Sequence, residues 1–587
     1  MCGIGGILMR DGSPADAGVL DRLAAAMAHR GPDGVGKYVS GPVGLVSTRL
    51  AIIDLRTGDQ PLFDGARALV ANGEIYNDPE VRAALGCDGY ATGSDCESAL
   101  RLYRRDGPAF VEGLRGMYAL ALHDQEAGRL VLARDPFGIK QLYLVETDAY
   151  LAFASEAAAL IAAGLATVRL RPAARAELAQ LKFTTGPQTI IDGIRRVLPG
   201  ELLIVEYGEI CGRRRSRALP LGERIGGDDE TLLKQLDAVL VDTVAHHLRS
   251  DVPYGLFLSG GIDSSALVAL MARLTDQPVY ALTAGFAASG GADETELAAR
   301  VAGAVGAEHH VVEVTESDFW TCAPQVAACL DDPTTDAAAL PTWLLARAAR
   351  GGMTVVLSGE GADEMFGGYS RYRRAGLLGA LAGRSRTRGV FRGALAAAPA
   401  LKGWRDGLAS AEAGERDRAR TTMQRLQAID CAEWLPNDLL VKLDRCLMAH
   451  SLEGRTPYLD PVVAEFAFRL PDRAKVRGRF GKWLLREWLA RNVPAAEPFA
   501  RKKGFNPPVG GWIAARAAQL APAVAAQPGV AEFLPGDAVR AAIADAANNG
   551  QAAWSLVFYA LWHSHHVLGV PAEGSIADVL AAASRAG

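Results

Sequence analysis

The chain has 587 residues, more than one hydrophobic core normally serves, and this length predicts about two to four domains. Its composition, 49% apolar and 22% charged, is typical of a globular protein. The net charge of −5, with dispersed lysines and arginines, argues against a nucleic acid or an anionic membrane as a partner. The eight cysteines form no CxxC pair and fit neither a zinc site nor a disulfide framework; since no signal-peptide pattern is present, we expect a cytoplasmic protein.

The first residues, Met1-Cys2-Gly3-Ile4, contain a candidate nucleophile. Removal of Met1 would leave Cys2 with a free α-amine beside its thiol. An α-amine has a pKa of about 8 in model peptides, so it can take the thiol proton without help from a histidine. A cysteine at position two also fits simple trimming of the initiator methionine, so other residues have to decide between the two interpretations.

Up to Gly212 the sequence consists of short alternating segments broken by glycine, proline and aspartate. This pattern predicts stacked antiparallel sheets. The predicted strands lie at 43–53, 67–71, 129–133 and 150–154. The charged, glycine-containing stretch 213–230 is predicted to be a linker, which makes 1–212 the first domain.

From Thr231 onward, helical runs alternate with short apolar strands, as expected of a parallel sheet between helices. The predicted strands lie at 254–258, 279–283 and 354–357. We therefore predict a second, α/β domain over 231–587 with many helices. The helical stretch 371–428 carries no motif and is interpreted as a packing or solvated region.

Three places in the first half offer groups that a thiol attacking an amide would need. Asn72-Gly73-Glu74 supplies an amide side chain, an unhindered backbone N–H and a carboxylate at the end of a predicted strand. Arg49 could bind a substrate carboxylate, and Asp95 could bind a substrate amine. Each of these residues alone also fits a turn or a surface position, so the hypothesis depends on their occurring together.

Six motifs of the first half follow the order and spacing of a known family. They are MCGI at 1–4, HRGPDG at 29–34, RLAIIDL at 49–55, NGEIYN at 72–77, TGSDCE at 92–97 and RDPFGIK at 134–140. With these motifs the first half resembles the class II glutamine amidotransferase domain. The resemblance implies an N-terminal-nucleophile hydrolase fold, an α+β sandwich with αββα layers. It also implies that Cys2 attacks the side-chain amide of glutamine to give a thioester, glutamate and ammonia.

The same resemblance assigns roles to individual residues. It makes Cys2 the nucleophile and implies that Asn72 and Gly73 form the oxyanion hole, which meets the negative charge of the tetrahedral intermediate. The residues that it implies for glutamine binding are Arg49, Leu50, Ile52, Asn72, Gly73, Glu74 and Asp95.

The string LSGGIDSS at 258–265 lies between a predicted strand and a predicted helix. Such a glycine-rich turn points backbone N–H groups and a helix N-terminus at an anion, and its serines add hydroxyl donors. It has no lysine and so differs from the GxxxxGK[ST] loop of enzymes that transfer the γ-phosphate. It resembles the pyrophosphate loop of enzymes that cleave ATP between the α- and β-phosphates and transfer AMP to a carboxylate. ATP is therefore the expected co-substrate.

A second string, LSGEGADE at 357–364, supports the nucleotide site. Asp263 and Asp363 supply one carboxylate from each string, a sparse oxygen set that suits Mg²⁺ held mainly by phosphate and water. By resemblance, Glu360 deprotonates the attacking ammonium or orients the acceptor, and Lys482 stabilises the adenylation transition state. The resemblance and the two strings together give as ATP-binding residues Leu258, Ser259, Gly260, Gly261, Asp263, Ser264, Ser265, Ala284, Ser358, Gly359 and Asp363.

Further motifs extend the resemblance over nearly the full length of the chain. They are DR at 444–445, MAHSLEGRTPYLD at 448–460 and KKGFNPPVGGW at 502–512. Together with the earlier motifs, they make the chain similar to the glutamine-hydrolysing asparagine synthetase family. The resemblance implies that ammonia released at Cys2 travels through a tunnel along the domain interface to an adenylated carboxylate, with L-aspartate as the leading acceptor. A homodimer is expected only as the family's habit.

Three departures from the family pattern leave the acceptor open. They are Gly454, Tyr458 and the pair Asn506-Pro507, in segments expected near the acceptor or the C-terminal helices. A carboxylate on a small peptide or a cell-surface sugar is therefore an alternative to aspartate. Cys2 argues against the β-lactam synthetase type, which lacks a working glutaminase cysteine. Because all the candidate catalytic residues are retained, a non-catalytic scaffold or nitrogen-sensing protein is a remote alternative.

Overall fold

The computed structural model describes residues 2–286, 294–378, 386, 388–416, 419–500 and 507–586. Its N-terminal half, residues 2–215, contains two six-stranded antiparallel sheets, with strand orders β10-β8-β9-β1-β3-β2 and β12-β11-β7-β6-β5-β4. The strands of the first sheet are β1 Gly3–Met9, β2 Gly34–Ser40, β3 Val43–Arg49, β8 Tyr143–Glu146, β9 Tyr150–Ala154 and β10 Ile194–Arg196. Those of the second are β4 Leu62–Asp64, β5 Arg67–Ile75, β6 Gly116–Asp124, β7 Arg129–Arg134, β11 Glu201–Glu206 and β12 Glu209–Arg215.

The two sheets enclose an apolar core and are covered by helices on their outer faces. Side chains such as Ile4, Leu45, Val70 and Leu132 fill the space between the sheets. Helices α1 and α4 pack on the first sheet, and α3 packs on the second. Because helices cover the outer faces, a central strand such as β6 is buried on both sides along its whole length. The helices of this half are α1 Ala17–Ala26, α2 Asp78–Leu85, α3 Glu97–Asp106, α4 Ala157–Ala162 and α5 Pro172–Leu181.

The C-terminal half, residues 229–586, is built on a five-stranded sheet in the order β15-β14-β13-β16-β17, and all its neighbouring strands are parallel. Parallel neighbours need long crossovers, which helices supply here. The strands are β13 Tyr254–Phe257, β14 Tyr280–Gly285, β15 Glu308–Glu313, β16 Val355–Leu357 and β17 Glu453–Arg455. The helices that surround the sheet are α6 Asp229–His247, α7 Ile262–Leu274, α8 Thr295–Val305, α9 Glu316–Cys329, α10 Ala339–Ala349, α11 Ala362–Phe366, α16 Leu440–Met448, α17 Pro461–Arg469 and α19 Trp483–Asn492.

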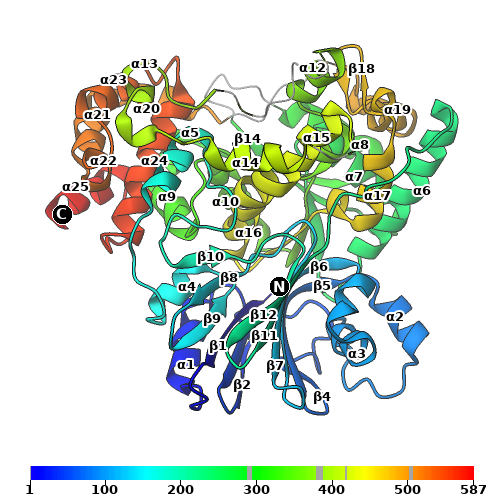
Figure 1. Cartoon of the computed structure of the whole chain (residues 1–587). Helices are drawn as coiled ribbons and strands as arrows, with labels where there is room; N and C mark the ends of the chain where they lie inside the picture. The colour runs from blue at the N-terminus through cyan, green and yellow to red at the C-terminus, as the bar shows by residue number, and fades with distance from the viewer. Residues whose placement is uncertain are drawn as a thin grey trace.

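The remaining helices extend this half on two sides. Between α11 and α16 in the sequence lie α12 Ser370–Leu378, α13 Gly393–Ala396, α14 Asp406–Gly414 and α15 Thr422–Ile429. Helix α18 Asp472–Lys475 lies between α17 and α19. The C-terminal group, at the upper left of Figure 1, consists of α20 Val509–Ala515, α21 Ala517–Ala526, α22 Pro528–Ala531, α23 Gly536–Ala544, α24 Gly550–His566 and α25 Ile576–Ala586. Because α24 is buried along most of its length, this group belongs to the main core.

Several strand ends differ from the sequence-based prediction. The strand predicted over 43–53 ends at Arg49, and Leu50, Ile52 and Ile53 pack instead into a core shared by the two halves. Their apolar pattern therefore reflects packing between the halves and not a longer strand. Strand β5 continues four residues beyond its predicted end, to Ile75. Strand β12 runs to Arg215 and α6 begins at Asp229, with residues 216–228 between them.

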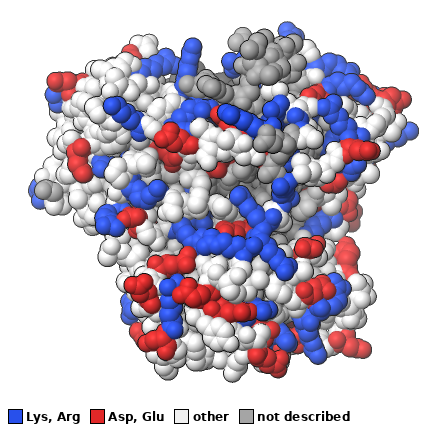
Figure 2. Space-filling view, viewed as in Figure 1, with Lys and Arg blue, Asp and Glu red and all other residues white. Residues whose placement is uncertain are grey.

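The two halves are in close contact (Figure 1), and the start of the chain lies where they meet. One apolar cluster includes Phe137 from the N-terminal half together with Leu258 and Leu357 from the C-terminal half. Figure 2 shows lysines and arginines gathered in a band across the middle of one face, with aspartates and glutamates below it. Within the described part of the chain, no helix is both long and apolar enough to cross a bilayer.

Candidate active sites

The Cys2 thiol lies at the start of β1, only 6% exposed, beside strand β5 of the other sheet. The Cys2 backbone N–H donates to Asn72 Oδ1 at 3.2 Å, and the Cys2 carbonyl accepts from Arg30 Nε at 3.4 Å. Gln60 Nε2 lies 3.9 Å from Sγ. Burial raises the pKa of the Cys2 thiol, although the Leu50 backbone N–H, which bonds the sulfur, lowers it. The thiol is therefore neutral at pH 7 and needs a nearby base to react.

Asn72 and Gly73 are consecutive residues of β5. Asn72 is fully buried, and its side-chain Nδ2 has no hydrogen-bond partner among the described residues. An unsatisfied buried donor costs free energy, so a ligand oxygen that accepts this hydrogen bond would be stabilised. A Cβ on Gly73 would lie 2.1 Å from the Met117 carbonyl oxygen, so no side chain fits there. The hydrogen bond from the Cys2 N–H to the Asn72 amide thus brings Asn72, with Gly73 next to it in β5, beside Cys2.

Two buried carboxylates and one arginine surround the same region. Burial raises the pKa of Asp95 to about 6, and burial together with the charge of Glu453 raises that of Glu74. Such carboxylates favour a cationic partner, as a substrate α-ammonium would be. The Arg49 guanidinium already pairs with the exposed Asp59, 2.8 Å away, and bonds the Ile53 carbonyl.

Leu50 and Ile52 follow Arg49 in the segment that leaves the sheet. Both side chains are buried in the apolar cluster shared by the two halves. The Ile52 carbonyl accepts from the Asp251 backbone N–H at 3.0 Å. The backbone of Leu50 therefore lies beside the Cys2 sulfur, whereas that of Ile52 bonds the C-terminal half, and the side chains of both residues pack in the contact between the halves.

The predicted pyrophosphate loop joins β13 to the N-terminus of α7. Gly260 has a left-handed backbone (φ +69°), which glycine adopts without strain. The Ser259 N–H donates to Ser264 Oγ at 3.1 Å, and the Gly261 N–H donates to Ser259 Oγ at 3.2 Å. Ser265 Oγ is buried without a hydrogen-bond partner among the described residues. The loop is thus held in one conformation by its own serines at the positive end of a 13-residue helix.

Lys482 joins the two carboxylates that the sequence assigned to a metal. Its Nζ lies 2.7 and 2.6 Å from the two oxygens of Asp263 and 2.7 Å from Asp363 Oδ1. Burial lowers the pKa of Lys482, but the two carboxylates outweigh it and leave that pKa raised. Lys482 also has a left-handed backbone (φ +55°), an uncommon conformation for a residue with a side chain. Asp263 and Lys482, 219 positions apart in the sequence, thus form part of one cluster of charged side chains.

The donor set fits a magnesium ion held largely by other ligands. Two carboxylates converge on one cation, and the described residues contain no group of three or more histidines, cysteines, aspartates and glutamates that could enclose a metal. Mg²⁺ commonly takes one or two protein carboxylates and completes its six ligands with phosphate and water. Asp263 and Asp363 are therefore the residues that would hold it.

Glu360 and its neighbours lie at the end of the adjacent strand, β16. A Cβ on Gly359 would lie 3.0 Å from the Asp263 Cβ, so the two nucleotide loops touch. Burial raises the pKa of Glu360, and Lys442 Nζ, 3.5 Å from its carboxylate, opposes that shift. Lys442 also pairs with Asp336 at 3.2 Å. The other residues expected around the nucleotide, Leu258, Ala284 and Ser358, are buried at the carboxyl ends of β13, β14 and β16.

Several residues in contact with these sites were not singled out by the sequence. Lys442 stands alone in the apolar run LLVKL, a pattern that could have indicated a buried lysine. Arg30 lies in HRGPDG and Asp444 in DR, and their side chains meet at 2.9 Å. Arg445 continues this buried network to Asp331 at 2.6 Å. Two motifs cited separately thus form one charged contact between the halves.

The departures noted for the acceptor region have structural explanations. A Cβ on Gly454 would lie 2.8 Å from Leu447, so α16 packs against this glycine. The Tyr458 hydroxyl donates to the backbone carbonyl of Asp263 at 2.9 Å and so supports the pyrophosphate loop. Asn506 lies outside the described residues, and Pro507 precedes α20.

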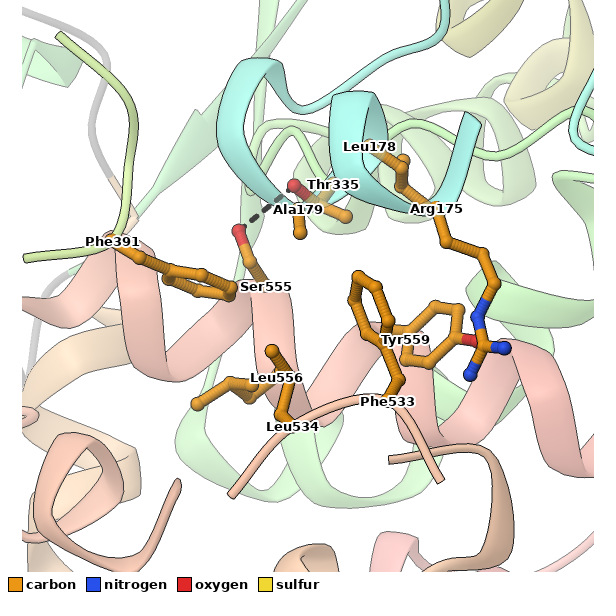
Figure 3. Close-up of a pocket in the computed structure, with 10 residues that line it drawn as sticks. All are labelled: Arg175, Leu178, Ala179, Thr335, Phe391, Phe533, Leu534, Ser555, Leu556 and Tyr559. Carbon is orange, nitrogen blue, oxygen red and sulfur yellow. Dashed lines mark hydrogen bonds between the residues drawn. The ribbon is translucent and has the colours of Figure 1, made fainter. Parts of the chain in front are cut away.

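A small pocket lies apart from the residues discussed above. It is formed between α5 and α24 (Figure 3), where Arg175 and Tyr559 line one side and Phe391 the other. Thr335 and Ser555 are joined across it by a 2.9 Å hydrogen bond. Since its lining is mainly apolar and includes none of the candidate catalytic residues, we do not assign it to either site.

Comparison with known proteins agrees with both halves of the structure. Residues 1–215 match the family model of the glutamine amidotransferase domain, and residues 235–564 match that of asparagine synthase. The chain is 30% identical to asparagine synthetase [glutamine-hydrolyzing] 1 of Bacillus subtilis, over 97% of each chain. It is 33% identical to a putative asparagine synthetase [glutamine-hydrolyzing] of Mycobacterium tuberculosis, over 93% of this chain and 94% of the other.

A relative with a different name shares less of the length. A Penicillium rubens protein named as an amidase is 31% identical over 64% of this chain and 60% of its own. The two family models together span most of the chain, and the resemblance read from its motifs is confirmed. The chain belongs to the glutamine-hydrolysing asparagine synthetase family.

Proposed function

We propose that this protein hydrolyses glutamine at Cys2 and uses the ammonia to convert an ATP-activated carboxylate, that of L-aspartate, into its amide. The observation that carries this proposal is the convergence of Asp263, Asp363 and Lys482 beside a serine-rich helix N-terminus. A kinase-type reaction would need a different loop, whereas adenylation needs an anion cradle and charges to meet departing pyrophosphate. The same chain holds the buried Cys2 thiol near one buried amide donor, Asn72 Nδ2, that has no partner among the described residues.

In the glutaminase step the oxyanion is stabilised by uncharged hydrogen-bond donors. After removal of Met1, the α-amine of Cys2 takes the thiol proton, and the thiolate attacks the carboxamide carbon of glutamine. Asn72 Nδ2 and the Gly73 N–H stabilise the resulting oxyanion. The protonated amine returns its proton to the leaving nitrogen, so ammonia departs and a thioester remains. Water, deprotonated by the same amine, then releases glutamate and restores the thiol.

In the synthetase step the side chains act mainly through charge. An oxygen of the acceptor carboxylate attacks the α-phosphorus of ATP, pyrophosphate leaves, and an acyl-adenylate forms. Lys482 lies where it can neutralise charge on the phosphates. Mg²⁺ bound by Asp263 and Asp363 would offset the charge of the leaving pyrophosphate. Ammonia then attacks the acyl carbon, Glu360 accepts the proton that the nitrogen loses, and AMP departs.

Transfer of ammonia inside the protein follows from the chemistry of the two steps. At neutral pH ammonia released to solvent would be diluted and mostly protonated, and the ammonium ion is not a nucleophile. We propose that it travels along the contact between the two halves, where confinement raises its effective concentration. The apolar cluster shared by the halves supports such a route, because it keeps bulk water away from the interface.

The acceptor is the least constrained part of the proposal, and a second candidate is an amide-forming reaction on another carboxylate, such as one on a small peptide or a surface sugar. A relative named as an amidase supports keeping it. The test is pyrophosphate release from ATP and Mg²⁺ with glutamine across a panel of carboxylates. Stimulation by aspartate with stoichiometric asparagine supports the first candidate. Stimulation by a different carboxylate alone would favour the second, and the absence of stimulation by any carboxylate of the panel would contradict aspartate and favour an acceptor outside the panel.

A further inference from the structure

A guanidinium from the C-terminal half lies against the glutamine-binding region of the N-terminal half. Arg455 belongs to β17 and is fully buried. Its Nη2 lies 3.2 Å from Glu74 Oε2, although no hydrogen-bond partner of this nitrogen is found among the described residues. Its Nε donates to Glu453 at 2.6 Å, and its Nη1 donates to the His247 carbonyl at 2.7 Å. Arg455 is therefore held in one orientation with its Nη2 within ion-pair distance of Glu74.

The surroundings of Glu74 work against its negative charge. The residue is only 6% exposed, and burial is the largest cause of its raised pKa. The carboxylates of Glu453 and Asp95 raise that pKa further, whereas Arg455 and, to a smaller extent, the α-amino group at the start of the chain lower it. A protonated Glu74 could not attract an ammonium group. Arg455, a residue of the other half, thus favours the charged form of Glu74, although the pKa of Glu74 stays raised overall.

Arg455 is fixed to the nucleotide region by its backbone. Strand β17 pairs with β16 in parallel, and the Ser358 N–H donates to the Arg455 carbonyl at 2.9 Å. Ser358 begins the second nucleotide loop. The same residue therefore faces the glutamine region with its side chain and borders the nucleotide region with its carbonyl.

We propose that Arg455 is a positioning residue of the glutaminase site, contributed by the synthetase half, which orients the Glu74 carboxyl group and favours its charged form for the α-ammonium of glutamine. The inference rests on the proposed function, because it takes Glu74 as a glutamine-binding residue. It makes the glutamine pocket incomplete without the C-terminal half. A purely structural interdomain ion pair is the competing explanation.

The test compares Arg455→Met with Arg455→Lys in the full-length protein. Arg455→Met should raise the KM for glutamine about 30-fold or more, the usual range for removing one member of a buried charge pair, and change kcat for glutamine hydrolysis much less. The acid limb of kcat/KM for glutamine should move to higher pH, because Glu74 would ionise less readily. Arg455→Lys keeps the charge and should restore most of both properties. Ammonia-dependent synthesis should stay near wild type and reports correct folding.

A matched control removes a different buried arginine that joins the halves. Arg196 pairs with Asp332 at 2.6 Å, is 1% exposed, and contacts none of the residues around Glu74. Arg196→Met should leave the KM for glutamine and its pH profile unchanged. If it changes both as much as Arg455→Met does, the effect is general loosening of the interface and the inference is wrong.

Two further outcomes are decisive. A folded Arg455→Met protein with the wild-type KM for glutamine and the wild-type acid limb would overturn the inference and leave the proposed function intact. Wild-type protein that does not hydrolyse glutamine would overturn the proposed function, and the inference with it. If Arg455→Met does not fold, Arg455→Gln gives the same readout, since it keeps N–H donors for Glu453 and the carbonyls but carries no charge.

Discussion

At the N-terminal site the proposed nucleophile is a buried thiol near an amide donor that has no partner among the described residues, whereas at the C-terminal site an ammonium and two carboxylates are already paired. The thiol can react only after a base has accepted its proton, because the thiolate is the nucleophilic form. In the proposed function, the second arrangement would meet charge that develops on phosphate oxygens. The contrast explains how one chain can carry both reactions without either set of groups replacing the other.

The largest expected effect separates the two sites completely. Cys2→Ala should reduce glutamine hydrolysis and glutamine-dependent synthesis to background, because the proposed thioester forms on the Cys2 sulfur. Amide formation from added ammonium salt should persist, since the second site needs only ammonia. The assay measures glutamate and amide product separately. Loss of both activities in a folded variant would contradict two separate sites.

The proposed mechanism also predicts the covalent structure of the N-terminus. Fully glutamine-active protein should begin at Cys2, because the mechanism needs a free α-amine. Intact-mass measurement checks this directly. Active protein that retains Met1 would rule out the α-amine as the base.

The next effect concerns the charged site alone. Asp263→Asn and Asp363→Asn should each reduce ATP-dependent amide formation by about 10²- to 10⁴-fold, by analogy with the loss of a single group at other charged transition states. Glutamine hydrolysis should survive, because it uses neither carboxylate. Steady-state rates of pyrophosphate and glutamate release measure the two effects. Near-wild-type synthesis in both variants would mean that the LSGGIDSS loop and its metal assignment are over-interpreted.

The sequence predicted best those features that depend on local structure. The glycine-rich string at 258–265 was predicted to join a strand to a helix, and it does join β13 to α7. It also predicted the antiparallel and parallel character of the two halves. It placed the end of the strand at 53 instead of 49, because alternation cannot distinguish a sheet face from a face that packs between domains.

What the sequence could not predict are contacts made by packing between the halves. Arg455 meets Glu74 although 381 positions separate them, and Arg30 meets Asp444 across 414. The motifs containing these residues were recognised, but nothing in their spacing indicates which side chains face each other. Asp336 likewise lies in an unremarked loop and becomes important only through Lys442. Tertiary packing alone brings such partners together.

A smaller effect is expected from removing Asn72, the neutral oxyanion donor proposed for the glutaminase site. Asn72→Ala should lower kcat for glutamine hydrolysis by about 10²- to 10³-fold, the usual cost of removing one oxyanion donor, and should leave ammonia-dependent synthesis unchanged. Asn77→Ala is the matched control, because it removes an amide of the same motif whose side chain bonds the backbones of Gly113 and Arg115 instead. Equal losses in the two variants would mean that Asn72 acts through the fold and not on the oxyanion.

The smallest effect is a change in pH dependence at the charged site. Burial raises the pKa of Glu360, and Lys442 lowers it from 3.5 Å away, so removing that cation must raise the pKa further. A base works only when ionised, and the acid limb of ammonia-dependent synthesis should therefore move upward in Lys442→Met. We expect about one pH unit, since an opposite charge within about 4–6 Å commonly shifts a carboxyl pKa by about 1–3 units.

The control for this shift removes a second lysine that binds the same aspartate. Lys182 Nζ lies 3.4 Å from Asp336 Oδ1, whereas Lys442 contacts both Asp336 and Glu360. Lys182→Met should therefore move the acid limb less than Lys442→Met does, because it alters Glu360 only through Asp336. The pH–rate profile of each variant, measured with saturating ATP and ammonium salt, decides the order. An unchanged limb in Lys442→Met would show that the group titrating in synthesis is not Glu360, and the base would then have to be sought elsewhere in the second site.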